Sequence, residues 1–154
     1  QKFNLYNASM GGDLAGLIQM RDGNNGENFT GQVTAAGKVP LMGVCLGHQA
    51  IGEAFGGKLE NLKEVHHGVQ TPISIIKSNE LFNGLEGEIL VGRYHSWVVS
   101  PQEFPDCLEI TAESKEGEVM ALRHKQYRVF GIQFHPESVL TPQGKTIISN
   151  FLNL

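Results

Sequence analysis

A cysteine lies between two glycines in the segment Gly43-Val44-Cys45-Leu46-Gly47, after an apolar run and before a helical pattern. This is the pattern of a nucleophile elbow in which Cys replaces Ser. The glycines are needed because the elbow holds the nucleophile in a strained backbone conformation and leaves no room for nearby side chains. We expect the positive end of the following helix to lower the pKa of the Cys45 thiol. The alternative is an ordinary buried cysteine at the end of a strand.

A thiolate nucleophile needs a histidine, and the histidine needs a carboxylate to orient it. His135 follows the apolar run 129–134, and Glu137 comes two residues later, across Pro136. The proline stiffens the segment and can hold the carboxylate near the imidazole. Because functional residues gather at the carboxyl ends of parallel strands, we expect Cys45 and His135 to lie close together. Taken alone, His-Pro-Glu could also be a polar turn.

The remaining histidines give weaker signals. His48 could lie near the sulfur or serve packing, His95 could line a pocket or a surface turn, and His124 is expected on a solvated basic face. Cys107 has no activating neighbours. The sequence has no HExxH or CxxC spacing, which argues against a zinc site, and no GxGxxG or GxxxxGK[ST] motif, which leaves nucleotide binding unsupported.

Apolar runs and turn residues predict a chain in which strands predominate after residue 58. A buried strand at 38–44 leads into the elbow and then into a helix at 48–55, which Gly56-Gly57 ends. In the first 32 residues no strand pattern occurs, and only a short helix from Asp13 to Arg21 is predicted. The further predictions are strands at 71–76, 88–94, 108–112, 119–123 and 129–134 and a closing helix at 144–154.

Composition excludes several classes of protein. The chain has 154 residues, of which 40% are hydrophobic and 18% charged, so it can form a packed core. A net charge of −4 argues against non-specific binding to nucleic acid or to an anionic membrane. No apolar run approaches the roughly 18 residues of a membrane span. Two cysteines are too few for a disulfide scaffold, and a cytoplasmic location is expected.

The segments 43–51 and 134–138 resemble class I, triad-type glutamine amidotransferases. The segments 67–68, 92–96 and 140–144 are similar to those of the glutaminase subunits of anthranilate synthase and aminodeoxychorismate synthase. The resemblance covers residues 33–154, which we expect to form the amidotransferase domain. It implies an α/β fold with a flavodoxin-like, open, mostly parallel sheet flanked by helices, and an additional region of antiparallel strands.

The resemblance also implies roles for individual residues. Cys45 would be the nucleophile, His135 the general base and then acid, and Glu137 the group that orients the imidazole. The substrate glutamine would be held through the backbone N–H of Leu46, which forms part of the oxyanion hole, and through Gln49, Ser96 and Trp97. The family usually has Leu at the position of Trp97, so packing beside the pocket is expected to differ.

The function implied is hydrolysis of glutamine to glutamate, with transfer of ammonia to a chorismate-using synthase subunit. That partner would be anthranilate synthase component I, which serves tryptophan synthesis, or aminodeoxychorismate synthase, which serves folate synthesis; anthranilate synthesis is the first choice. Neither a cofactor nor a metal is implied. The alternatives are a non-catalytic regulatory module that docks on a synthase and, as a weaker option, a γ-glutamyl-peptide hydrolase.

Residues 1–32 do not resemble the start of this family. The family opens with a buried strand and has a Pro-Gly-Pro-Gly segment that supplies a second oxyanion donor, and neither is evident in the sequence. We therefore expect residues 1–32 to be an unplaced segment and the N-terminal part of the domain to be incomplete. A chain without that donor would lose about a hundredfold to a thousandfold in rate.

Overall fold

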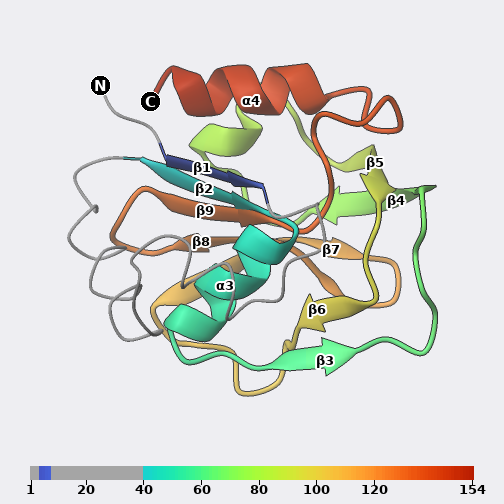
Figure 1. Cartoon of the computed structure of the whole chain (residues 1–154). Coiled ribbons are helices and arrows are strands. Elements are labelled where there is room, and N and C mark those ends of the chain that lie inside the picture. Colours follow the sequence, from blue (N-terminus) through green and yellow to red (C-terminus); the bar gives the residue numbers. More distant parts are fainter. Residues whose placement is uncertain (1–3, 8–39) are drawn as a thin grey trace.

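A single seven-stranded sheet organises the computed structural model, which describes residues 4–7 and 40–154. The helix expected at Asp13–Arg21 and the first residues of the expected strand 38–44 lie outside the described residues. The strands follow the order β1-β2-β9-β8-β7-β4-β5 across the sheet (Figure 1).

Parallel pairing occurs at the β1 end of the sheet. Strand β2 (Leu41–Val44) lies between β1 (Asn4–Asn7) and β9 (Val129–Ile132) and runs parallel to both. All residues of β2 and β9 are buried, as the continuous apolar runs predict. Strand β1 corrects the expectation of no strand in the first 32 residues. Within the described residues β1 is the end strand of the sheet and pairs with β2 through its backbone, so this four-residue strand needs no alternating pattern.

Antiparallel strands form the rest of the sheet: β8 (Val119–His124), β7 (Leu108–Ser114), β4 (Val69–Ile75) and β5 (Glu88–Arg93). A turn at 115–116 joins β7 to β8, and a longer segment with a turn at 83–84 joins β4 to β5. The expected α/β class, with parallel strands and an additional antiparallel region, is confirmed; the described sheet is mixed.

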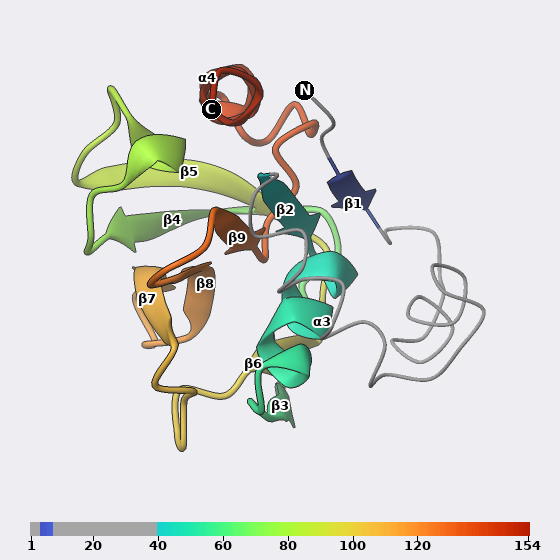
Figure 2. The ribbon, with the colours of Figure 1, turned by 90° about the vertical axis from the view of Figure 1, so that its left-hand side faces the viewer.

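Helices cover both faces of the sheet. On one face, α3 (Leu46–Ala54) packs through Ala50 and Ile51 on Leu41 and Val129. On the other, α4 (Gly144–Leu152) and the 3-10 helix η2 (Glu80–Phe82) lie over the alternate residues of the same strands. Figures 1 and 2 show α3 and α4 on opposite sides of β2. Helix α3 begins two residues earlier than predicted, directly after the cysteine. No helix in the described ranges is long and apolar enough to cross a membrane.

A small second sheet, absent from the sequence prediction, completes the fold. Strands β3 (Leu59–Asn61) and β6 (Trp97–Val99) pair antiparallel beside α3. Each strand has only three residues, and β3 is mostly exposed, so neither shows a hydrophobic alternation. The pair positions the segment that follows His95 against the elbow helix, where Val99 contacts Gly52.

Candidate active site

Cys45 lies at the sharp turn between β2 and α3, with φ 54° and ψ −105°. A positive φ is a strained conformation for a residue with a side chain and is typical of a nucleophile elbow. The Cys45 N–H donates to the carbonyl of Ile132 at 2.8 Å, which fixes the turn against the end of β9. At Gly43 a Cβ would lie 2.5 Å from the backbone of Gly47, so the elbow closes only with glycine there.

The environment of the sulfur differs from the expectation of a lowered pKa. Burial raises the pKa of the Cys45 thiol to about 11, against the lowering effect of the Leu46 backbone N–H. The charge of Glu137 raises the same pKa further, and the Gln133 amide, whose Nε2 lies 3.7 Å from the sulfur, lowers it. Desolvation of the thiolate therefore outweighs the helix N-terminus.

His135 and Glu137 form the pair that the sequence predicted. His135 Nδ1 lies 2.6 Å from Glu137 Oε1, and the imidazole is buried whereas the carboxylate is half exposed. The rings of Tyr94 and His135 pack edge to face, with their centroids 5.1 Å apart. With Nδ1 facing the carboxylate, Nε2 is the nitrogen that remains for proton transfer.

The loop after β9 is held by hydrogen bonds to β5. The His135 N–H donates to the Gly92 carbonyl at 3.0 Å. The Thr141 hydroxyl accepts from the Gly92 N–H at 2.8 Å and donates to the His135 carbonyl at 2.7 Å. The hydroxyls of Tyr94 and Ser138 are 2.9 Å apart. These bonds fix the backbone on both sides of the histidine.

Cys45 follows β2 and His135 follows β9, so both lie beyond the carboxyl ends of two neighbouring parallel strands. That Cys45 acts together with His135 and Glu137 stays a prediction. A pocket of about 390 Å³ opens at His135 and Glu137 and is also lined by Tyr94, Ser138 and Val139.

Two of the residues expected to bind glutamine, Gln49 and Trp97, contact each other beside α3. Gln49 is buried, and its Nε2 donates to the Trp97 carbonyl at 2.9 Å. The Ser96 carbonyl accepts from the Leu62 N–H at 2.7 Å, which holds that backbone segment in place. The Leu46 N–H faces the Cys45 sulfur. The Trp97 side chain is 46% exposed, so its backbone rather than its ring belongs to this cluster.

Burial decides between the alternatives left open for His48 and His95 and tests the expectation for His124. His48 is fully buried against Gly131, and burial lowers its pKa to about 3, so it packs as a neutral ring. His95 is also buried and lies in a hydrogen-bond network. The prediction that His124 lies on a solvated face is wrong, because its ring is buried and packs between Phe55 and Tyr127. Its Nδ1 accepts two backbone N–H bonds, which replace water.

Sequence reasoning missed Gln133, which contacts both the sulfur and Gln49. A single polar residue inside the apolar run 129–134 was the available signal. Within residues 4–7 and 40–154, no group of three or more His, Cys, Asp or Glu side chains is arranged to hold a metal ion.

The comparison with protein families agrees with this geometry. The family model "Glutamine amidotransferase class-I" matches residues 24–154. The chain therefore belongs to the class-I glutamine amidotransferase family.

Two curated relatives point to one branch of this family. The chain is 49% identical over 122 residues to anthranilate synthase component 2 of Pseudomonas aeruginosa, and 47% identical over 118 residues to aminodeoxychorismate synthase component 2 of Escherichia coli. These matches cover 76% and 77% of the chain but only 60% and 63% of the relatives. A glutamine amidotransferase of Thermotoga maritima has the same fold, with a TM-score of 0.65 at 15% identity over 89% of this chain and 53% of that one.

Proposed function

We propose that this chain is a glutaminase subunit that hydrolyses glutamine through a Cys45 thioester and passes ammonia to a chorismate-using synthase. The observation that carries the proposal is the strained Cys45 at the elbow beside the bonded pair of His135 and Glu137. The proposal assigns this activity to residues 33–154 and places the protein in the cytoplasm.

The chemistry assigned to these groups follows from their arrangement. His135 takes the Cys45 proton, the sulfur attacks the side-chain amide carbon of glutamine, and the oxyanion accepts the Leu46 N–H. His135 then gives its proton to the departing nitrogen, which leaves as ammonia. Water, deprotonated by His135, attacks the thioester, and glutamate leaves with regeneration of the thiol. Glu137 keeps the imidazole oriented throughout.

Recognition of the amino-acid end of glutamine is assigned to Gln49 and the backbone of Ser96 and Trp97. The two N–H groups of Gln49 donate to the Trp97 carbonyl and to Gln133 Oε1 at 2.9 and 3.1 Å. Its Oε1 is thereby left as the acceptor that this buried amide can offer to an ammonium group.

The partner is proposed from the relatives, whose names carry both anthranilate synthase and aminodeoxychorismate synthase. Anthranilate synthesis is the first choice and aminodeoxychorismate synthesis the second. Free ammonia is protonated in water and lost as a nucleophile, so transfer to the synthase needs a closed passage between the subunits.

The test is glutamate release from glutamine, measured with chorismate and with the component I subunit of either synthase. Wild-type chain should release glutamate, and Cys45→Ser should abolish release. Cys107→Ser is the matched control, because Cys107 is a partly exposed free cysteine outside the site, and it should retain the wild-type rate.

Equal rates for wild type and Cys45→Ser would refute the proposal. Stable binding of the synthase without labelling of Cys45 by a glutamine-analogue electrophile would instead identify a non-catalytic module. Formation of anthranilate or of aminodeoxychorismate distinguishes the two synthase partners.

A further inference from the structure

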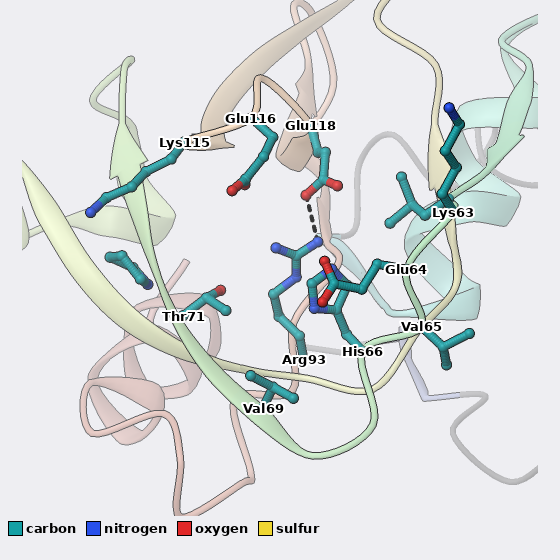
Figure 3. Close-up of a pocket in the computed structure, with 12 residues that line it drawn as sticks. Lys63, Glu64, Val65, His66, Val69, Thr71, Arg93, Lys115, Glu116 and Glu118 are labelled. Carbon is teal, nitrogen blue, oxygen red and sulfur yellow. Dashed lines mark hydrogen bonds and ion pairs between the residues drawn. The ribbon is translucent and has the colours of Figure 1, made fainter.

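An ion pair between a buried arginine and a partly buried glutamate connects to the candidate site through hydrogen bonds. Arg93 on β5 is 1% exposed, and its Nη2 lies 2.5 Å from Glu118 Oε2, at the turn before β8. Both side chains line a pocket of about 440 Å³, which Thr71 and His66 also line (Figure 3). A buried arginine needs a charged partner, which Glu118 supplies. Arg93 also makes a second hydrogen bond, to His95, which does not line the pocket.

The second bond of Arg93 fixes the tautomer of His95. Arg93 Nε donates to His95 Nε2 at 3.0 Å, and because a guanidinium only donates, Nε2 must be the acceptor. The ring hydrogen is therefore on Nδ1, which donates to the Trp97 carbonyl at 2.9 Å. Burial and the charge of Arg93 lower the pKa of His95 to about 3, so the ring stays neutral at physiological pH.

The Trp97 carbonyl connects the Arg93–His95 hydrogen bonds to the proposed glutamine site. It accepts from His95 Nδ1 and from Gln49 Nε2, each at 2.9 Å, so both of its lone pairs are used. Gln49 in turn donates to Gln133, whose own Nε2 lies 3.7 Å from the Cys45 sulfur. The orientation of the Gln49 amide, and with it the position of its Oε1, depends on this carbonyl.

We propose that Arg93 and Glu118 are a positioning pair for glutamine: through the His95 tautomer they fix the Trp97 carbonyl and the Gln49 amide. The inference rests on the proposed function, since it concerns the same site. The side-chain bonds of Arg93 go to Glu118 and to His95, which connects to the residues proposed to hold glutamine, so its effect falls on substrate binding. It also lines a pocket on its far side.

The experiment measures saturable inactivation of the chain by 6-diazo-5-oxonorleucine, a glutamine analogue that alkylates the nucleophile. Arg93→Lys keeps the buried charge, but one ammonium cannot reproduce the fork that reaches both Glu118 and His95. The half-saturating concentration should rise about tenfold, as for loss of one hydrogen bond, while the limiting inactivation rate stays near that of wild type. Glu118→Gln keeps an acceptor for Arg93 and should show a smaller rise.

Arg123→Lys is the matched control, because Arg123 on β8 pairs with Glu80 and Glu109 outside this network. Both parameters should stay within about twofold of wild type, as is usual for such a substitution. Equal half-saturating concentrations in wild type and Arg93→Lys would overturn the proposal, and so would a fall in the limiting rate alone.

A second readout separates this inference from the proposed function. The ring nitrogens of ¹⁵N-labelled protein should show His95 with hydrogen on Nδ1 in wild type, and a mixture of tautomers in Arg93→Lys. A wild-type protein that the analogue does not label contradicts the proposed function, and the tautomer still decides the positioning role of Arg93. Hydrogen on Nε2 in wild type overturns that role whether or not the protein is active.

Discussion

Gly144 offers a direct test of how the histidine is positioned. It is the first residue of α4, and a Cβ there would lie 1.8 Å from the Pro136 carbonyl oxygen and 2.7 Å from its carbon. Helix propensity alone predicts that Gly144→Ala stabilises the protein by up to about 1 kcal/mol. The close contact with Pro136 predicts instead that Gly144→Ala destabilises the protein, because the new Cβ and the Pro136 carbonyl oxygen must separate to at least 3.0 Å.

The carbonyl that must move belongs to the residue between His135 and Glu137. A displacement of about 1 Å at a catalytic group costs roughly a hundredfold in rate. Gly144→Ala should therefore reduce kcat/KM for glutamine about a hundredfold, measured as glutamate release with the synthase subunit present. Urea unfolding of the same variant at the assay temperature measures the fraction of protein that is folded, so that the rate can be given per folded molecule.

The control is Gly87→Ala, since nothing lies within 4 Å of a Cβ at Gly87 and its φ is +67°. That variant should lose about 1–2 kcal/mol of stability through backbone strain and keep its activity once folded. A Gly144→Ala protein that is more stable than wild type, or that is fully active when folded, would refute the reasoning. The packing of α4 on this loop would then not set the position of His135.

Two further predictions concern stability. Thr141→Val should lower the free energy of unfolding by about 2–4 kcal/mol, because it removes both hydrogen bonds of a buried hydroxyl. Thr71→Val removes a buried hydroxyl without a partner and should be neutral or stabilising. Urea midpoints that fall equally for both variants would contradict this. The second concerns pH: His48 and His95 have a pKa of about 3 in the folded chain against 6.5 for a free imidazole, so the unfolded state gains protons first as pH falls. Stability should be full above about pH 7 and fall below pH 6.5 by up to about 1.4 kcal/mol per pH unit for each ring, until about pH 3. A urea midpoint that is unchanged between pH 7 and pH 5 would exclude this effect.

The elbow and the His135–Glu137 pair could be predicted because their signals are local. Glycine at position 43 is required by its close contact with the Gly47 backbone, four residues along the chain. The apolar runs of β2 and β9 follow from burial on both faces. The proline between His135 and Glu137 likewise acts over two residues. Such constraints can be read from the order of the residues alone.

The rest depends on contacts between distant parts of the chain. Gln49 and Gln133 are 84 positions apart, and nothing near either residue indicates that their amides meet. His124 was misjudged because its charged neighbours suggested solvent, whereas Phe55, from the end of the elbow helix, covers it. Strands β3 and β6 form because they are brought together beside α3, not because their three-residue sequences favour a strand.

The raised pKa of Cys45 changes how the proposed mechanism must begin. With a pKa of about 11, the thiol is ionised in about one molecule in ten thousand at pH 7. The helix N-terminus and the Gln133 amide therefore do not prepare a standing thiolate. Proton transfer to His135 is then needed before or during attack on glutamine, and its rate depends on how closely the imidazole is held. The bonds that fix the His135 loop to β5, and the packing of Gly144 against Pro136, then contribute to the rate because they hold the imidazole in place.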